Sequence, residues 1–426
     1  MTAATTTVED AGSFRDDMKV ISLIGTAHFF SHFYILLLAP LFPILKDAFG
    51  VSYVQLGLIL TVANAATGVS QIPFGYLVDK VGAKWILIGG LAAHGLAFVL
   101  IGITGTYWAM LACMVLAGAA NGVYHPADYA ILSASVSEKR MGRGFSLHTF
   151  TGFAGFAAVP MTIVWLAQEF GWQAGVTACG AAGMVAALAL VVFGRSLKHA
   201  PGSDKRKKKG GDDTAAGAGG SIMLNPAILM CLLFFLLLAL SSGGINNFLV
   251  SALNRVHGTP VDSANLGLTF YLVGSSLGIL LGGVIADRTS NHNRVAACCF
   301  LATAVAVLIV GTVALPIWML VTLMALQGLT HGIIMPSRDM IVRSVTPAGS
   351  MGKVFGFVST GFSLGGIVAP LMFGFLLDRG EPALVFYVIA GFMVVSLLTV
   401  FSVGGKKDGG KKDGGKKDGG KNEAAA

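Results

Sequence analysis

Charged residues are scarce in this chain: 12% of its 426 residues are Asp, Glu, Lys or Arg, whereas 54% are hydrophobic. The mean hydropathy is +0.75, far above the balance of a soluble domain of this length. All five cysteines fall inside apolar segments, without the spacing of a zinc site or the pairing of a disulfide scaffold. We therefore expect a membrane protein in which the cysteines are packing residues.

Several functional classes lack their sequence signatures. No Gly-x-x-x-x-Gly-Lys-Ser/Thr loop and no cluster of nucleophile and base is present, so we expect neither an enzyme nor a bound cofactor. The net charge of +8 comes from loops and tails rather than from a base-stacking face, which argues against nucleic-acid binding. The first 19 residues are polar and lack the apolar core of a signal peptide. We expect the first apolar segment to remain in the mature protein.

The two halves of the sequence repeat one another at an offset of 210 residues, from Gly122 to Gly332. Eight identical residues define the repeat. They are Gly122, Pro126, Ile131, Met141, Gly142, Phe145, Gly155 and Pro160, which recur as Gly332, Pro336, Ile341, Met351, Gly352, Phe355, Gly365 and Pro370. A membrane protein built from two related halves is typical of transporters.

Apolar segments of about 20 residues, the length that a bilayer requires, occur six times in each half. They begin near residues 20, 53, 84, 107, 143 and 172, and again near 226, 264, 295, 317, 352 and 383. We predict an all-α membrane protein with twelve transmembrane helices in two pseudo-symmetric bundles. The expected division is an N-terminal tail (1–19), a six-helix bundle (20–194), a charged linker (195–224), a second bundle (225–403) and a disordered Lys/Gly-rich tail (404–426).

Positive charge is distributed unevenly between the loops. Lys and Arg collect in alternate loops, in the linker and in the C-terminal tail. By the positive-inside rule, both termini and the linker are predicted to be cytoplasmic, in a bacterial-type inner (plasma) membrane. The basic linker and tail either bind anionic membrane lipids or act only as topology determinants and tethers.

The loop after the second segment carries a recognisable motif. Gly75-Tyr-Leu-Val-Asp79-Lys80-Val-Gly82-Ala83-Lys84 resembles the signature between helices 2 and 3 of the major facilitator superfamily. A weaker copy, Gly283-Val-Ile-Ala-Asp287-Arg288, stands at the same place in the second half. The stretch from Asn121 to Asp128, with its His-Pro pair, is loosely similar to the fosmidomycin-resistance-like branch. The resemblance implies a monomeric secondary transporter whose halves rock about a central site.

The resemblance also implies roles for the motif residues. Gly75 and Gly82 allow close helix approach and a tight turn. Asp79 faces the positive end of a neighbouring helix in one conformation and leaves it in another, as a gate latch. The sequence departs from the family pattern at Ala83 and Ala134, where a basic and an acidic residue are usual. Lys80 or Lys84 is the candidate substitute.

Polar residues inside the membrane are few, and they match between the halves. The fourth segment carries Asn121, His125 and Asp128, spaced by four and three so that they share one helical face. The tenth segment carries Gln327, His331 and Arg338. The repeat aligns Asn121 with His331 and Asp128 with Arg338. The resemblance implies that both segments line the central cavity, so we expect the two faces to look across at each other.

Arg338 and Asp128 each admit two interpretations. Arg338 presents a fork of donors suited to a carboxylate or phosphonate, and is therefore a candidate anchor for an organic anion. The alternative is a permanent ion pair with Asp128 or Asp339. Asp128 is a candidate proton carrier or, alternatively, part of a gate salt bridge.

The remaining candidates lie on the first, fifth and seventh segments. His32 is a candidate for both substrate binding and proton relay, whereas His28 and His148 are expected to bond to backbone carbonyl groups. Asn246 and Asn247 are expected either to bind substrate or to pack helices. We expect no metal site, because no carboxylate or thiolate is expected to complete a histidine cluster.

The sequence thus predicts a transporter that moves a small solute, expected to be an organic anion, by proton-coupled alternating access. Two alternatives stay open. One is a proton-driven exporter of drug-like compounds or metabolites with the same fold. The other is a membrane receptor or sensor that binds without transporting.

Overall fold

The computed structural model describes residues 13–137, 140–197, 222–289, 291–347 and 350–404. Within these ranges the chain is helical, and twelve helical segments are long and apolar enough to cross a membrane. The prediction of twelve spans in an all-α protein is confirmed. Most of the expected linker and the C-terminal tail lie outside the described residues.

The N-terminal half forms six spans. Its helices are α1 (Phe14–Leu36), α2 (Phe42–Phe49), α3 (Tyr53–Val81), α4 (Ala83–Thr104), α5 (Tyr107–Asn121), α6 (Tyr124–Ser135), α7 (Met141–Phe170) and α8 (Trp172–Phe193). The 3-10 turn η1 (Ala39–Leu41) joins α1 and α2 into one span, and η3 (Gly194–Ser196) follows α8.

The C-terminal half forms the other six spans. Its helices are α10 (Pro226–His257), α11 (Val261–Arg288), α12 (His292–Thr312), α13 (Ile317–Val345), α14 (Met351–Asp378) and α15 (Pro382–Gly404). We call the face where α1 begins and α15 ends the terminal face. The other face, where α2 lies, α3 begins and α14 ends, is the α2 face.

Two helices differ from the sequence expectation for local reasons. Helix α1 begins at Phe14 rather than near residue 20, because Ser13 caps it and acidic Asp16 and Asp17 lie in its first turn. The fourth span is broken into α5 and α6 after Asn121. Pro126 lies in the first turn of α6, where its missing N–H group is tolerated.

Glycines bring α11 and α13 into close contact within the C-terminal half. A methyl group at Gly328 would meet the backbone of Tyr271, and one at Gly332 would meet the backbone of Ser275 and Gly278. Small residues are what allow membrane helices to pack this closely. The two helices consequently form a rigid pair beside the contact between the halves.

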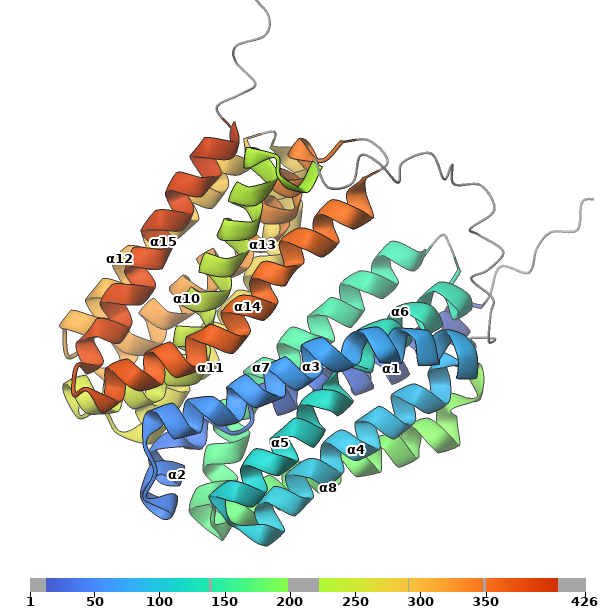
Figure 1. Ribbon diagram of the computed structural model, residues 1–426, viewed down its shortest axis with the longest axis horizontal. Helices are drawn as coiled ribbons and strands as arrows, with labels where there is room; N and C mark the ends of the chain where they lie inside the picture. Colours follow the sequence, from blue (N-terminus) through green and yellow to red (C-terminus); the bar gives the residue numbers. More distant parts are fainter. Residues whose placement is uncertain (1–12, 138–139, 198–221, 290, 348–349, 405–426) are drawn as a thin grey trace, which may run out of the picture.

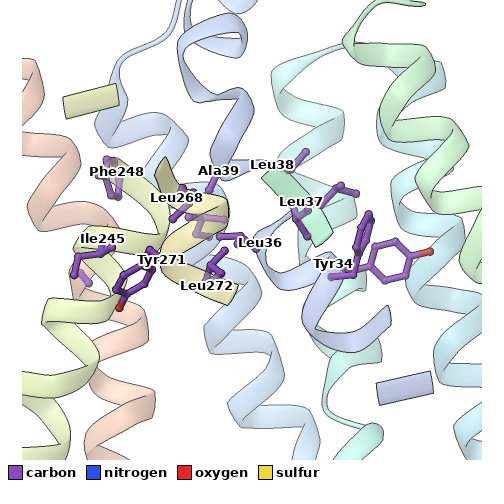
Figure 2. Packing of buried hydrophobic residues seen from close by; sticks show 14 of the residues in the cluster. Tyr34, Leu36, Leu37, Leu38, Ala39, Ile245, Phe248, Leu268, Tyr271 and Leu272 are labelled. Atoms are coloured by element: carbon purple, nitrogen blue, oxygen red, sulfur yellow. The ribbon is translucent and has the colours of Figure 1, made fainter. Parts of the chain in front are cut away.

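The halves meet through an apolar contact near the middle of the molecule. The turn η1 packs against α10, and Leu36 and Ala39 belong to the same buried cluster as Leu268 and Tyr271 (Figure 2). On the α2 face, the rings of Phe42 and Phe248 lie 5.6 Å apart in an edge-to-face arrangement. These contacts close the path between the halves on that side.

Helices α3 and α14 extend the closure along the side of the molecule. The Thr61 hydroxyl donates to the Ile367 carbonyl at 2.9 Å, and the Asn64 amide donates to the Gly366 carbonyl at 2.7 Å. Further along α3, a methyl group added at Gly68 or Gly75 would have no neighbouring atom within 4 Å. The ribbons of the two halves diverge toward the terminal face (Figure 1). The two halves are therefore in contact at the α2 face and spread apart toward the terminal face, which we call the open side.

Candidate functional site

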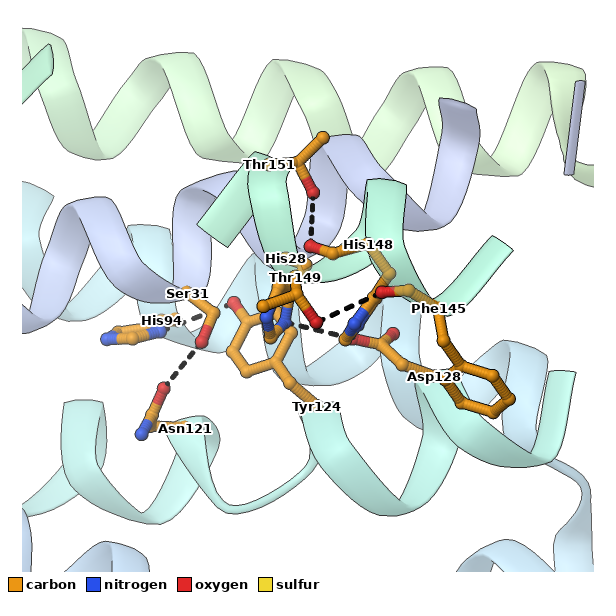
Figure 3. A network of polar contacts seen from close by, with 10 residues as sticks. All are labelled: His28, Ser31, His94, Asn121, Tyr124, Asp128, Phe145, His148, Thr149 and Thr151. Atoms are coloured by element: carbon orange, nitrogen blue, oxygen red, sulfur yellow. Dashed lines mark hydrogen bonds and ion pairs between the residues drawn. The ribbon is translucent and has the colours of Figure 1, made fainter. Parts of the chain in front are cut away.

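A carboxylate between two histidines forms the centre of the N-terminal half. Asp128 on α6 is fully buried, and its Oδ2 atom lies 3.0 Å from Nε2 of His148 on α7. Nδ1 of His28, on α1, lies 3.3 Å from the same oxygen without the geometry of a hydrogen bond. Among the residues that the structure describes, Asp128 Oδ1 has no hydrogen-bond partner. The group draws one side chain from each of three helices (Figure 3).

Two further histidines surround this group. The ring of His32 lies 4.6 Å from that of His28, one turn along α1 toward the α2 face, and packs against Phe156 at 4.5 Å. The ring of His125 lies 5.4 Å from that of His28, and His125 is exposed. A histidine cluster (His28, His32, His125 and His148) therefore extends from an accessible position to the buried Asp128.

Gly152 on α7 makes room for the histidine cluster. A methyl group at this position would lie 2.8 Å from His28 Cδ2 and Nε2, and 3.0 Å from His32 Cε1. Real Cβ contacts are essentially never shorter than 3.0 Å. The absence of a side chain on one helix thus permits two imidazoles on another.

The expectation that no carboxylate would complete a histidine cluster is wrong, because Asp128 lies beside His28 and His148. Donor atoms of His28, Asp128 and His148 lie within 4.8 Å of one another. Nδ1 of His28 and Nε2 of His148 lie near the same carboxylate oxygen, and their rings stack with centroids 3.7 Å apart and an interplanar angle of 26°. The group therefore has residue types that can share a proton or ligate a metal ion.

His28 and His148 were each expected to bond to a backbone carbonyl group. The structure instead places both beside Asp128. Helical spacing identifies which residues share a face, but it does not reveal which neighbouring helix the face meets. Only the folded structure shows that two histidines from different helices meet an acidic residue on a third helix.

A second polar layer lies beside the histidine cluster. The Ser31 hydroxyl donates to Asn121 Oδ1 at 3.0 Å, and the Asn121 amide donates to the Thr67 hydroxyl at 3.5 Å. Nearby, Nδ1 of His94 lies 3.3 Å from the hydroxyl of Tyr124. Figure 3 shows Ser31, Asn121, His94 and Tyr124 together.

This layer borders a cavity of about 50 Å³ between the halves. Asn64, Thr67, His94 and Asn121 line it from the N-terminal half, and Asn247 on α10 lines it from the C-terminal half. The structure thereby brings together Asn121 and Asn247 from the predicted set. Asn64 and His94 were missed, although an asparagine inside an apolar segment is itself a signal. We call this space the amide cavity.

The expected meeting of the two polar faces across the centre is wrong in this conformation. His331 is buried within the C-terminal half, where its Nδ1 atom lies 3.2 Å from the Ser275 hydroxyl on α11. Gln327, one turn away on α13, is buried with an unpartnered Oε1 atom. Asn246 Oδ1 is likewise buried and, in the described part of the chain, has no partner. None of these three lines the amide cavity.

Arg338 pairs with its neighbour rather than with Asp128. Its Nε and Nη2 atoms each lie 2.8 Å from Asp339 Oδ1. The guanidinium stacks on two aromatic rings, 4.6 Å from the centroid of Phe235 and 5.1 Å from that of Phe362. Of the two ion pairs considered from the sequence, the structure contains the one with Asp339. The side chain is 15% exposed, so the cation stays accessible at its edge.

The motif between α3 and α4 lies at the terminal face, where two of its charged residues are exposed. Gly82 has φ 102° and forms the turn between α3 and α4, a conformation that favours glycine. Asp79 and Lys80 are exposed, and Lys84 Nζ lies 5.1 Å from the ring centroid of Trp85. The close approach expected at Gly75 is not made. In the second half, Asp287 and Arg288 at the end of α11 are also exposed.

A second hollow of about 290 Å³ lies between α7 and α11, on the side toward the terminal face. Its walls combine the rings of Phe150 and Phe153 with the hydroxyl groups of Ser146, Thr149 and Ser276. No charged residue lines it among the described residues. We call this space the aromatic hollow.

The sequence matches the family model of the Major Facilitator Superfamily over residues 24–245 and again over 231–424. The chain belongs to this superfamily. It is therefore a multi-pass membrane protein of a transport family, as the sequence motif indicated.

Individual proteins are similar to most of the chain. It is 23% identical to a fosmidomycin resistance protein of Escherichia coli, over 91% of this chain and 93% of that one. It is 23% identical to a probable sulfoacetate transporter, SauU, of Cupriavidus necator, over 79% of this chain and 82% of the other. The crystal structure of a bacterial homologue of the human lysosomal transporter Spinster, inward-facing and occupied, superimposes with a TM-score of 0.75. That likeness covers 92% of this chain and 98% of the other at 13% identity, and shows the fold.

Proposed function

We propose that this protein is a secondary active transporter that moves a small organic anion by proton-coupled alternating access. The observation that carries the proposal is the buried carboxylate of Asp128 between His28 and His148. Imidazole and carboxyl groups exchange protons readily, and a charge buried in the membrane is costly unless it is paired. A proton shared within this group is the natural coupling element.

The histidine cluster supplies a proton route. His125 is the exposed member of the cluster, and its ring adjoins that of His28, whose Nδ1 atom lies 3.3 Å from Asp128. His32 lies on the other side of His28, nearer the α2 face. In this proposal, Asp128 receives a proton from the open side through His125, and His32 connects it to the α2 face after the halves rock.

The substrate is proposed to use both halves of the molecule. Arg338 supplies the positive charge for an anionic group, which competes with Asp339 for the guanidinium. Asn121 and Asn247 supply amide groups for the polar body of the substrate. The sulfoacetate named for the Cupriavidus relative is itself a small organic anion, which is in keeping with this assignment. The remaining candidate substrate contacts are His125, His331, Gln327, His32 and Asn246.

We further propose that the terminal face is cytoplasmic and that the protein works as a monomer in a bacterial-type inner membrane. Lys80, Arg140, Arg288 and Arg343 all lie at helix ends on the terminal face. Such an excess of positive charge is typical of the cytoplasmic side. The open side of this structure then faces the cytoplasm.

The coupling is tested in proteoliposomes that contain a pH-sensitive dye. Small carboxylates, sulfonates and phosphonates are added to the wild type, to Asp128→Asn and to Arg338→Gln. We expect Asp128→Asn to abolish anion-driven proton flux while substrate exchange persists. We expect Arg338→Gln to raise the half-saturating anion concentration about tenfold or more, the effect of losing a charge-assisted contact. Asp16→Asn, an exposed acid in the first turn of α1, is the matched control.

The aromatic hollow favours a second candidate function, the export of drug-like or amphipathic compounds. Its apolar and hydroxyl-bearing walls suit a neutral ring or alkyl group, and a fosmidomycin resistance protein is among the relatives. If only neutral or cationic amphipaths move protons, and Arg338→Gln transports normally, this function replaces the first. If probes bind but no counterflow occurs, a receptor or sensor role replaces both.

A further inference from the structure

Helices α3 and α14 are antiparallel neighbours from different halves, and each carries an aspartate in its last turn. Asp79 lies two residues before the end of α3, and Asp378 is the last residue of α14. A negative charge at the C-terminal end of a helix is unfavourable for that helix. Because the helices are antiparallel, each aspartate lies on the face of the membrane where the other helix begins.

Asp378 caps the first turn of α3. Its Oδ1 atom accepts a hydrogen bond from the backbone N–H of Tyr53, and its Oδ2 atom accepts one from Val54, each at 2.8 Å. The N–H groups on either side, of Ser52 and Gln55, are bound by the capping box that these two residues form with each other. The four donors that a helix start leaves free are thus all satisfied, and two of them are satisfied by the other half.

The contact continues from Asp378 toward the middle of the membrane. A methyl group at Gly374 would lie 2.6 Å from the Tyr53 carbonyl oxygen, so the helices touch through their backbones there. The Thr61 and Asn64 bonds to α14 follow. Asp79, at the other end of α3, is exposed and has no hydrogen bond or ion pair among the described residues.

We infer that Asp378 is a positioning residue that holds the α2 face closed by capping α3 across the contact between the halves. When the protein opens on that face, α3 and α14 separate and the two N–H groups are released to water. The inference rests on alternating access in the proposed function, but not on the identity of the substrate.

The test measures accessibility of single cysteines in a background from which the five native cysteines have been removed. Ala63→Cys lines the amide cavity behind the closed contact, and Gln71→Cys is exposed where α3 has left α14. A membrane-impermeant maleimide is added from the α2 side to label position 63, and from the terminal side to label position 71. Asp378→Asn removes the charge at constant shape.

We expect Asp378→Asn to raise labelling at position 63 about tenfold and to lower labelling at position 71, because two charge-assisted bonds of the closed state are weakened. Asp378→Glu should restore most of the wild-type pattern. Glu381→Gln, an exposed carboxylate three residues further on, should leave both rates unchanged. Asp378→Ser, which keeps an oxygen acceptor without the charge, repeats the measurement if the asparagine variant does not fold.

Opposite changes in labelling at positions 63 and 71 distinguish a residue that holds one conformation from a residue that only stabilises the fold. Loosening of the whole fold would raise labelling at both positions, and that result would overturn the inference, as would unchanged rates. Labelling needs no substrate. If no anion drives proton flux, the proposed coupling is wrong, but the role of Asp378 is unaffected. If labelling is unchanged while flux is normal, only the role of Asp378 is wrong.

Discussion

At the scale of single residues, position 152 leaves no room for a side chain. It is enclosed by His28 and His32, and these two imidazoles occupy the space where its side chain would lie. Gly155, further along α7, lies against the backbone of Phe29 on α1. The sequence alone does not identify these neighbours, because a glycine reveals the absence of a side chain but not which residues occupy the space.

Replacement of Gly152 by alanine tests this packing. The added methyl group would force His28 or His32 to move, and the alignment with Asp128 would be lost. We expect Gly152→Ala to lower proton-coupled flux about tenfold or more, since a small displacement of precisely aligned groups has effects of this size, while the protein still elutes as a folded species. Gly142→Ala, on the same helix, is the control and should behave as wild type, because the added methyl group would meet no described atom within 4 Å. Equal loss in both variants would contradict the packing argument.

At the scale of helices, the sequence predicted positions well and interruptions poorly. Apolar length located all twelve spans, because a bilayer demands a minimum run of apolar residues. It did not locate the break between α5 and α6, where the turn at Gly122 keeps the apolar pattern intact. It also missed the extension of α1 to Phe14, which depends on the Ser13 cap rather than on hydropathy.

The α11 and α13 pair offers a prediction about stability. Gly328 lies against the backbone of Tyr271, so that any side chain would push the helices apart. We expect Gly328→Ala to destabilise the protein by about 1–3 kcal/mol, as overpacking of a tight contact does, and to lower the thermal unfolding midpoint in detergent. At Gly283 on α11, an added methyl group would meet no described atom within 4 Å. Gly283→Ala should therefore leave the unfolding midpoint equal to that of the wild type within experimental error. A similar midpoint for both variants would show that the pair tolerates separation.

At the scale of the whole molecule, the repeat predicted two related halves but not which conformational state they adopt. Alternating states of one chain share the same helices, so hydropathy and spacing cannot distinguish them. This is why the expected approach of the two polar faces failed: Asp128 is buried in one half and His331 in the other. The partner of Arg338 was decided by local proximity, since Asp339 is adjacent and Asp128 belongs to the other half.

Fixing the closed face should stop transport. A cysteine pair at Thr61 and Ile367 spans the contact between α3 and α14, where the Thr61 hydroxyl and the Ile367 carbonyl are 2.9 Å apart. We expect a short bifunctional methanethiosulfonate to abolish substrate counterflow in this variant, because the halves can no longer rock, and a reductant to restore it. Each single-cysteine variant treated in the same way should retain its activity. Continued counterflow in the cross-linked protein would show that this contact does not open during the cycle.

The seal between α3 and α14 joins a side chain on one helix to the main chain of the other at each of its hydrogen bonds. Asp378, Thr61 and Asn64 provide the side chains, and Tyr53, Val54, Ile367 and Gly366 provide only backbone atoms. Since every amino acid except proline carries the same backbone groups, the second set is free to vary without breaking a bond. Homologous transporters with this seal can therefore diverge in sequence at the positions that contribute only backbone, and evolutionary constraint falls on one partner of each contact.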